Sequence, residues 1–163
     1  MLELQLRSRE ERWDLSSQDG EIIVGSRGRS PNPILLCAEA PGETEAQRGQ
    51  PLVGRTGKEL DRLLAMHGLS SRSWFVTNVC KSYIEGNPDP TPDLIARWTP
   101  TLIQEIVRCQ PRFLIAMGRF AARWFLGPDI DMDQCHGMPS YADPSCPAYD
   151  YLIASPATII IPV

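Results

Sequence analysis

Short apolar runs, bounded by residues that break regular structure, recur along this chain. Runs of this length, rich in β-branched and aromatic residues, are typical of buried strands. They predict four strands, at residues 34–38, 74–79, 113–117 and 158–163.

Amphipathic stretches lie between the predicted strands. Their apolar residues recur at helical spacing and predict helices over residues 56–67, 92–108 and 119–126. Gly68 is the expected C-cap of the first helix, and Pro100 is expected to kink the second, which has Pro92 near its start. Strands that alternate with helices favour parallel pairing through right-handed crossovers. The pattern therefore predicts an α/β fold, a three-layer α/β/α sandwich with a central four-stranded, mostly parallel sheet.

The other segments carry weaker patterns. Residues 21–24 are compatible with a short edge strand, residues 27–29 with a basic loop, and residues 129–155 with a long acidic connection rich in proline. A chain of 163 residues most often forms one domain with a full core. We expect a single domain over residues 1–163, in which residues 1–30 form an N-terminal extension or an edge of the sheet.

Composition narrows the class of protein. The 42% apolar and 22% charged residues are ordinary for a globular chain. No apolar run approaches the roughly 18 residues that span a bilayer, and the N-terminus lacks the apolar core of a secretory signal. We therefore expect no membrane partner and a cytoplasmic location.

The five cysteines form no CxxC pair and are expected to be free thiols. Cys135 and His136 are adjacent without a second pair, which is a weak metal signal, so no metal site is expected.

The formal net charge of −4 argues weakly against nucleic-acid binding, because affinity for phosphates comes from Lys and Arg. The basic residues are unevenly distributed, however. Six of them cluster around the motifs described next: Arg48, Arg55, Lys58, Arg62, Arg72 and Lys81.

Residues 38–42 (AEAPG) directly follow the first predicted strand. Pro41 fixes φ and Gly42 permits positive φ, and together they favour a sharp turn. Because ligands bind at the carboxyl ends of strands in open α/β sheets, Glu39 is expected on a stiff backbone at the mouth of a crevice. Taken alone, the segment is equally compatible with an ordinary surface carboxylate in a strand-to-loop turn.

A glycine-rich loop, residues 49–58 (GQPLVGRTGK), opens the first predicted helix. Exposed amides at a helix N-terminus, with Arg55 and Lys58 beside them, suit a phosphate group. The loop is not a P-loop, because Leu52 stands where a glycine is required and Glu59 replaces the hydroxyl residue that would hold magnesium. A nucleoside triphosphatase is therefore not expected. The alternative is that the glycines only allow the loop to turn tightly and that it binds no phosphate.

The second predicted strand ends within residues 77–81 (TNVCK). In a parallel sheet, Asn78 would lie at the same edge as Glu39. Its carboxamide offers a donor and an acceptor together, the pattern needed to bind the edge of a base. An Asn at a strand end is also a common turn former, so the functional interpretation depends on Glu39 lying nearby. Gly118, at the end of the third predicted strand, is interpreted as structural.

These motifs resemble those of the uracil-DNA glycosylase superfamily, most closely its iron–sulfur types, families 4 and 5. The family's GEAPG and GRPFVGRAG match residues 38–42 and 49–57, and its TNVVK matches residues 77–81. Its PTP and LGRxA match residues 90–92 (PTP) and 117–121 (MGRFA). The resemblance covers roughly residues 33–126.

The resemblance implies a monomeric DNA-repair hydrolase that flips deoxyuridine out of uracil-containing DNA and cuts its N-glycosidic bond. Glu39 would orient or deprotonate the attacking water and offset the positive charge on the sugar. Asn78 would hydrogen-bond the uracil edge and reject cytosine, and Glu45 would crowd C5 and exclude thymine. The loop would hold DNA phosphates through Gly54, Arg55, Gly57 and Lys58.

The chain departs from the family's pattern at three places. Leu52 stands at the position of the family's uracil-stacking Phe, and because base–aromatic stacking contributes roughly 1–3 kcal/mol, uracil binding is expected to be weaker. The cluster cysteines are missing: Ser82 and Trp98 stand at two of their positions, and Cys80 is one residue out of place. We therefore expect no iron–sulfur cluster and no other cofactor.

The family's His-Pro motif would follow the last strand, but the sequence stops at Val163. We therefore expect a truncated C-terminal end and weak or no activity.

Two interpretations follow. The first is a cluster-free uracil-DNA glycosylase-like enzyme of base excision repair. The second is a catalytically degenerate module of the same fold that binds a nucleobase or DNA without turnover. A small-molecule phosphate-binding α/β domain, suggested by the glycine-rich helix start, is a weaker third.

Overall fold

The computed structural model describes residues 20–154 and 156–163. Four parallel strands form one sheet, in the order β2-β1-β3-β4. Each strand lies within the apolar run that predicted it, which confirms the α/β fold with a parallel central sheet. The strands are β1 (Ile34–Ala38), β2 (Phe75–Asn78), β3 (Phe113–Ala116) and β4 (Ile159–Pro162).

The three predicted helices are present with small shifts at their ends. They are α2 (Arg55–Met66), α3 (Pro92–Cys109) and α4 (Arg119–Leu126). Thr91 caps α3 by accepting a hydrogen bond from the Leu94 amide, and the helix continues through Pro100. The C-cap of α2 is His67, and Gly68 follows it with a φ of +71°. Shorter helices are α1 (Glu43–Arg48), α5 (Met132–Cys135) and α6 (Tyr149–Leu152), with the 3-10 turn η2 (Ser71–Ser73).

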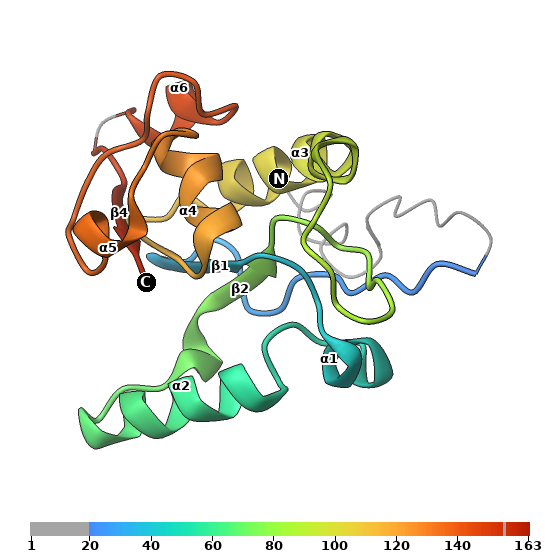
Figure 1. Cartoon of the computed structure of the whole chain (residues 1–163). Helices are drawn as coiled ribbons and strands as arrows, with labels where there is room; N and C mark the ends of the chain where they lie inside the picture. Colours follow the sequence, from blue (N-terminus) through green and yellow to red (C-terminus); the bar gives the residue numbers. More distant parts are fainter. Residues whose placement is uncertain (1–19, 155) are drawn as a thin grey trace, which may run out of the picture.

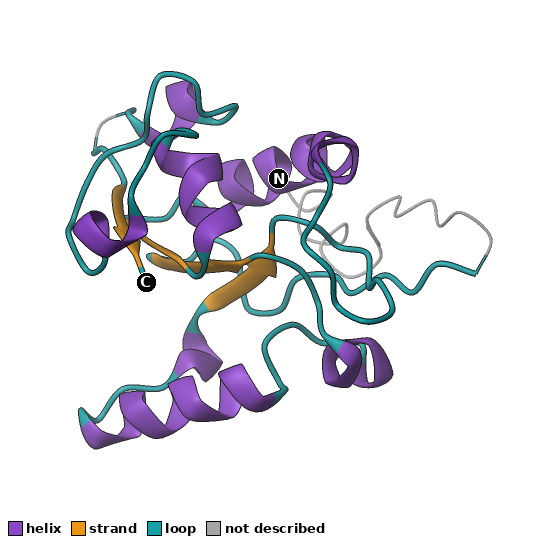
Figure 2. Cartoon of the chain, in the orientation of Figure 1, coloured by secondary structure: helices purple, strands orange, loops and turns teal. Residues whose placement is uncertain are grey.

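The helices lie on both faces of the sheet, with α3 and α4 on one side and α1 and α2 on the other (Figures 1 and 2). Because successive side chains of a strand point to opposite faces, β1 contributes to two apolar clusters. Leu35 and Cys37 belong to the large cluster with α3 and α4, whereas Leu36 belongs to a smaller cluster against which α2 packs. This alternation produces the predicted three layers.

The N-terminal part of the described chain does not form the expected edge strand at residues 21–24. Ile23 makes an isolated antiparallel bridge to Ser82, and Arg27 makes a second one to Val76. Only Val76 belongs to β2, since Ser82 lies beyond the end of the strand, and no continuous ladder joins the two bridges. The Arg27 guanidinium also donates to the carbonyl oxygens of Pro51 and Ser71, so the expected basic loop is tied to the body of the fold. Residues 1–19 of the expected N-terminal extension lie outside the described residues.

The long connection before β4 contains α5 and α6 and covers the outer edge of the sheet. The amide of Ser140 donates to Ile160 at 2.8 Å, and the amide of Gly137 donates to Pro162 at 2.7 Å. Covering an edge strand in this way satisfies its backbone groups and blocks pairing with other chains. Among the helices of the described residues, none has the length and apolar character needed to cross a membrane.

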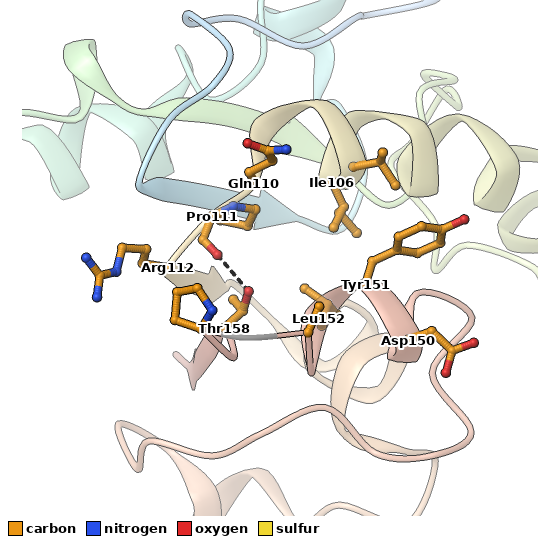
Figure 3. A pocket seen from close by; sticks show the side chains of 11 residues that line it. Ile106, Gln110, Pro111, Arg112, Asp150, Tyr151, Leu152 and Thr158 are labelled. Carbon is orange, nitrogen blue, oxygen red and sulfur yellow. Dashed lines mark hydrogen bonds between the residues drawn. The ribbon is translucent and has the colours of Figure 1, made fainter.

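A pocket of about 460 Å³ lies at the amino ends of β3 and β4 (Figure 3). Arg112 and Thr158 line it immediately before these strands begin, and the Thr158 hydroxyl donates to the Pro111 carbonyl at 2.6 Å. Ligands of open α/β sheets bind at the opposite, carboxyl edge. This pocket therefore lies at the edge of the sheet opposite to the one where a ligand is expected.

Candidate functional site

The carboxyl ends of β1 and β2 hold Glu39 and Asn78 at one edge of the sheet. Ala38 pairs with Asn78 in the parallel ladder. The pairing continues beyond the strands, because the amide of Val79 donates to Ala38 at 2.8 Å and the amide of Cys80 donates to Glu39 at 2.9 Å. The backbone on both sides of the site is thus fixed by sheet hydrogen bonds.

A pocket of about 440 Å³ opens at this edge. Its lining includes these predicted site residues: Glu39, Glu45, Leu52, Arg55 and Asn78. The predicted phosphate-binding residues Gly54, Gly57 and Lys58 lie beside it, at the N-cap and in the first turn of α2, but do not line it. Sequence reasoning did not select some further lining residues, namely Thr56, Asn87, Met117 and Val163.

The Glu39 carboxylate is held by the N-terminus of α4. Its Oε1 accepts a hydrogen bond of 2.8 Å from the amide of Phe120, and helix N-termini favour negative charge. Gly118 lies directly against this carboxylate with a φ of +89°, and a Cβ added there would be 2.5 Å from Oε1. Gly118 therefore does more than shape a turn, because its missing side chain makes room for Glu39. The sequence signal was a glycine at the tip of a strand beside the one that carries Glu39.

The Asn78 side chain is buried but incompletely bonded. The residue is 2% exposed. Among the buried side-chain nitrogen and oxygen atoms in the part of the chain that the structure describes, only its Nδ2 lacks a hydrogen-bond partner. An unpaired buried donor costs about 1–3 kcal/mol. Because Asn78 also lines the pocket, a ligand with an acceptor atom would satisfy this donor.

Glu45 organises the glycine-rich loop. Its Oε1 accepts hydrogen bonds from the amides of Val53 at 2.9 Å and Gly54 at 2.6 Å. A Cβ at Gly42 or Gly54 would lie 2.9 Å from a Glu45 carboxylate oxygen, so the loop closes tightly around this side chain. The Gly54 amide, predicted to hold a DNA phosphate, already donates to Glu45.

Leu52 occupies an unusual backbone position at the pocket wall. Its φ is +56°, in the left-handed region that few non-glycine residues adopt. Gly57 makes this turn possible, because a Cβ there would lie 2.1 Å from the Leu52 carbonyl oxygen. Leu52 is 8% exposed and packs in the smaller apolar cluster with Trp74. The loop is therefore a fixed wall of the pocket.

Comparison with known proteins adds independent information. The family model of the Uracil DNA glycosylase superfamily matches residues 26–159. The chain belongs to this superfamily. This confirms the resemblance inferred from the motifs.

Several relatives within the superfamily are Type-4 uracil-DNA glycosylases. The chain is 35% identical to that of Archaeoglobus fulgidus over 97 residues, which cover 60% of the chain and 49% of the relative. It is 37% identical to that of Saccharolobus solfataricus over 102 residues, 62% of the chain and 47% of the relative. It is 31% identical to that of Thermotoga maritima over 119 residues, 72% of the chain and 62% of the relative. Their names support the closeness to family 4. The chain spans about half the length of most of these curated relatives.

The iron–sulfur cluster suggested by the resemblance to superfamily families 4 and 5 does not fit the residues present. Trp98 and Ser82, at two of the cysteine positions, are buried and bonded to each other, with Trp98 Nε1 donating to Ser82 Oγ at 2.7 Å. Burial raises the pKa of Cys80 to about 12, which disfavours the thiolate that ligates iron. Within residues 20–154 and 156–163, no three His, Cys, Asp or Glu side chains are grouped so that they could hold a metal ion.

Proposed function

We propose that this chain carries the base-excision site of a uracil-DNA glycosylase, which hydrolyses the N-glycosidic bond of deoxyuridine in DNA. One observation carries the proposal: the Glu39 carboxylate and the unpaired, buried Nδ2 of Asn78 line the same pocket. The pocket lies where ligands bind in open α/β sheets, and the chain belongs to the superfamily.

Asn78 would select the base. Uracil presents a carbonyl acceptor beside an N–H donor, and a carboxamide can pair with both groups. Cytosine carries an amino group at the position of that carbonyl and would place a donor against Nδ2. A site built to hydrogen-bond one pattern discriminates strongly, because the wrong partner leaves a buried polar group unpaired.

Glu39 would act on the sugar and the attacking water. Its Oε1 is bonded to the Phe120 amide, while among the described residues Oε2 makes no hydrogen bond. Oε2 is therefore the atom that would accept a hydrogen bond from water and orient it toward the anomeric carbon. The negative charge would also stabilise the oxocarbenium-like transition state.

The remaining predicted residues complete the proposed site. Glu45 is fixed by two amides and would form the wall that meets C5 of the base. Leu52 would contact the face of the base without the stacking that an aromatic ring provides. Arg55 and Lys58 are exposed at the start of α2 and would contact DNA phosphates. We also propose that the site works without an iron–sulfur cluster, which the Trp98–Ser82 hydrogen bond supports.

The test is single-turnover cleavage of an oligonucleotide that contains one uracil. Because Val163 lines the pocket, the chain is assayed both as it stands and with His-Pro-Ala appended after Val163. We expect Glu39→Ala to lower the rate by about 10²–10³-fold, and Asn78→Ala to lower the rate and the preference for uracil over cytosine. Glu43→Ala, which removes a neighbouring carboxylate bonded to Gln47 and outside the pocket, is the matched control and should leave the rate unchanged. Absence of uracil release from both forms would refute the enzymatic proposal.

The alternative function is binding without turnover, which the unpaired Asn78 amide also favours. Fluorescence anisotropy with uracil-containing, abasic and unmodified DNA, measured beside the cleavage assay, distinguishes an enzyme from a module that only binds. Preferential binding of uracil-containing or abasic DNA by a form that cleaves nothing would identify a binding module.

A further inference from the structure

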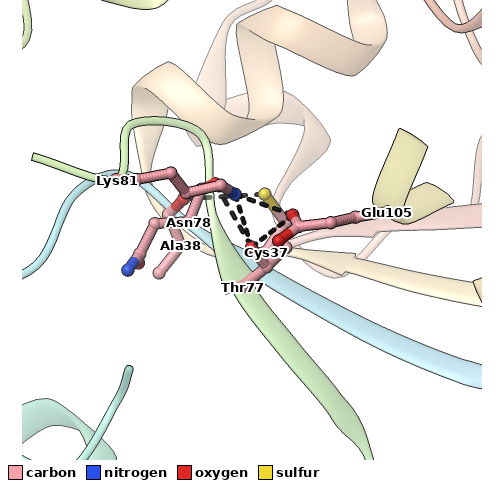
Figure 4. Close-up of polar contacts among 6 residues, drawn as sticks. All are labelled: Cys37, Ala38, Thr77, Asn78, Lys81 and Glu105. Atoms are coloured by element: carbon pink, nitrogen blue, oxygen red, sulfur yellow. Dashed lines mark hydrogen bonds and ion pairs between the residues drawn. The ribbon is translucent and has the colours of Figure 1, made fainter. Parts of the chain in front are cut away.

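A buried network of charged and polar groups lies directly behind Asn78 (Figure 4). Lys81 is 0% exposed, and its Nζ donates to the Glu105 carboxylate at 2.7 Å and to the Thr77 hydroxyl at 2.6 Å. A third bond runs from Nζ to the backbone carbonyl of Asn78. Glu105, which is 1% exposed and belongs to α3, also accepts from the Thr77 hydroxyl at 2.7 Å. All three ammonium protons of Lys81 thus have acceptors.

The need for the third bond follows from the position of β2 at the edge of the sheet. Backbone groups two residues apart on a strand point the same way. The outward amide and carbonyl of Val76 are bonded to Arg27 at 2.8 and 2.9 Å. The carbonyl of Asn78, two residues further on, has no strand beside it and is bonded by Lys81 instead.

The same alternation separates the network from the pocket. Thr77 points toward α3 and Glu105, whereas the Asn78 carboxamide points away from the network and lines the pocket (Figure 4). Lys81 therefore bonds the main chain of Asn78 from behind and leaves the side chain available to a ligand.

A buried ion pair is a poor means of stabilising a fold. Replacing such a pair by apolar residues is often neutral or stabilising, whereas removing one partner is strongly destabilising because it leaves an uncompensated buried charge. Stability alone thus gives little reason for a fully buried Lys81 and Glu105 beside the site.

We propose that Lys81, held by Glu105, is a positioning residue that fixes the main chain of Asn78 so that its carboxamide meets the base in one orientation. This inference rests on the proposed function of Asn78. Lys81 touches no ligand in this scheme, because it is buried on the other side of the strand.

The test replaces the network with apolar side chains, using Lys81→Met, Glu105→Leu and Thr77→Val together in the full chain, so that no charge or side-chain polar group of the network is left unpaired and only the Asn78 backbone carbonyl loses its bond. We expect the triple variant to fold with a modest loss of stability from the unbonded Asn78 carbonyl, as measured by urea unfolding. We expect kcat/KM on uracil-containing DNA to fall about tenfold, with a reduced preference for uracil over cytosine. The side-chain NH₂ signals of Asn78 in an ¹⁵N-correlated NMR spectrum should broaden or shift.

Ser82→Ala is the matched control. It removes another buried hydrogen bond between α3 and the segment after β2, but leaves the Lys81–Asn78 bond intact. It should lower stability and leave the Asn78 signals and the base preference unchanged. A folded triple variant with wild-type kinetics and wild-type Asn78 signals would overturn the inference.

If the triple variant does not fold, the Lys81→Gln, Glu105→Gln double variant, which keeps neutral hydrogen-bonding groups, is measured in the same way. Wild-type Asn78 signals in this double variant would show that the charged ammonium of Lys81 is not needed to hold Asn78, which would overturn the inference. If the wild-type chain releases no uracil, the proposed function fails, but the NMR comparison still decides whether Lys81 orders Asn78.

Discussion

The Glu39 carboxylate depends on a neighbour that has no side chain. Gly118 contacts Oε1 so closely that a methyl group there would displace the carboxylate from the Phe120 amide. Small displacements of a catalytic group are costly, since a shift of about 1 Å can lower a rate by about 10²-fold.

We therefore expect Gly118→Ala to lower uracil excision by about 10²-fold. Gly68→Ala is the control, because Gly68 also has a positive φ, of +71°, but has open space around its Cα. Both variants should lose about 1 kcal/mol of unfolding free energy from backbone strain, and only Gly118→Ala should also lose activity. Equal activity in the two variants would show that Gly118 does not position Glu39.

Single residues of the site were predictable where a motif joined a strand end to a polar side chain. Glu39 and Asn78 were found in this way, and both line the pocket. The hydrogen bonds that hold Glu39 and Asn78 in place were not predictable, because they come from distant segments. The Phe120 amide lies in the first turn of α4, and Glu105 lies in the C-terminal half of α3. Sequence reasoning assigned Gly54 to phosphate binding because it could not foresee that Glu45 would bond its amide.

Among the elements, α3 and the segment after β2 are joined by side chains where the resemblance would place a metal cluster. The Trp98–Ser82 hydrogen bond and the Lys81–Glu105 pair both make this connection. We expect protein purified without oxygen to contain no stoichiometric iron, and its urea unfolding midpoint to be unchanged by a strong iron chelator. Stoichiometric iron, or a lower midpoint with the chelator, would contradict the proposal.

The elements themselves were largely predictable. The buried strands stood out because a parallel sheet covered on both faces needs continuous apolar runs. The expected edge strand at residues 21–24 was wrong, because Ile23 makes an isolated bridge to Ser82, which lies beyond the end of β2, and it is Arg27 that bridges β2 itself. The connection over residues 129–155 gave no clear prediction, since α5 and α6 have only four residues each and carry little periodicity.

The charge of the whole molecule opposes its proposed substrate. The formal net charge is −4, and DNA is a polyanion. Binding would therefore depend on local cations, of which Arg55 and Lys58 are exposed at the start of α2, beside the pocket.

We expect the Arg55→Ala, Lys58→Ala double variant to weaken binding to uracil-containing and unmodified DNA alike. The slope of log affinity against log salt concentration should become shallower by about 2. Arg62→Ala, on the same helix but paired with Glu59 at 2.7 Å, is the control and should change the slope less. Salt titrations followed by fluorescence anisotropy measure both, and an unchanged slope in the double variant would exclude these phosphate contacts.

The central place of β1 in the sheet restricts how the molecule can respond to a substrate. Because β1 is hydrogen-bonded to β2 on one side and to β3 on the other, Glu39 and Asn78 cannot move apart without breaking the ladder between them. This half of the cavity is therefore preformed in the absence of a base. Any adjustment to different bases would then have to come from lining segments outside both this ladder and the fixed glycine-rich loop, such as the segment that carries Asn87.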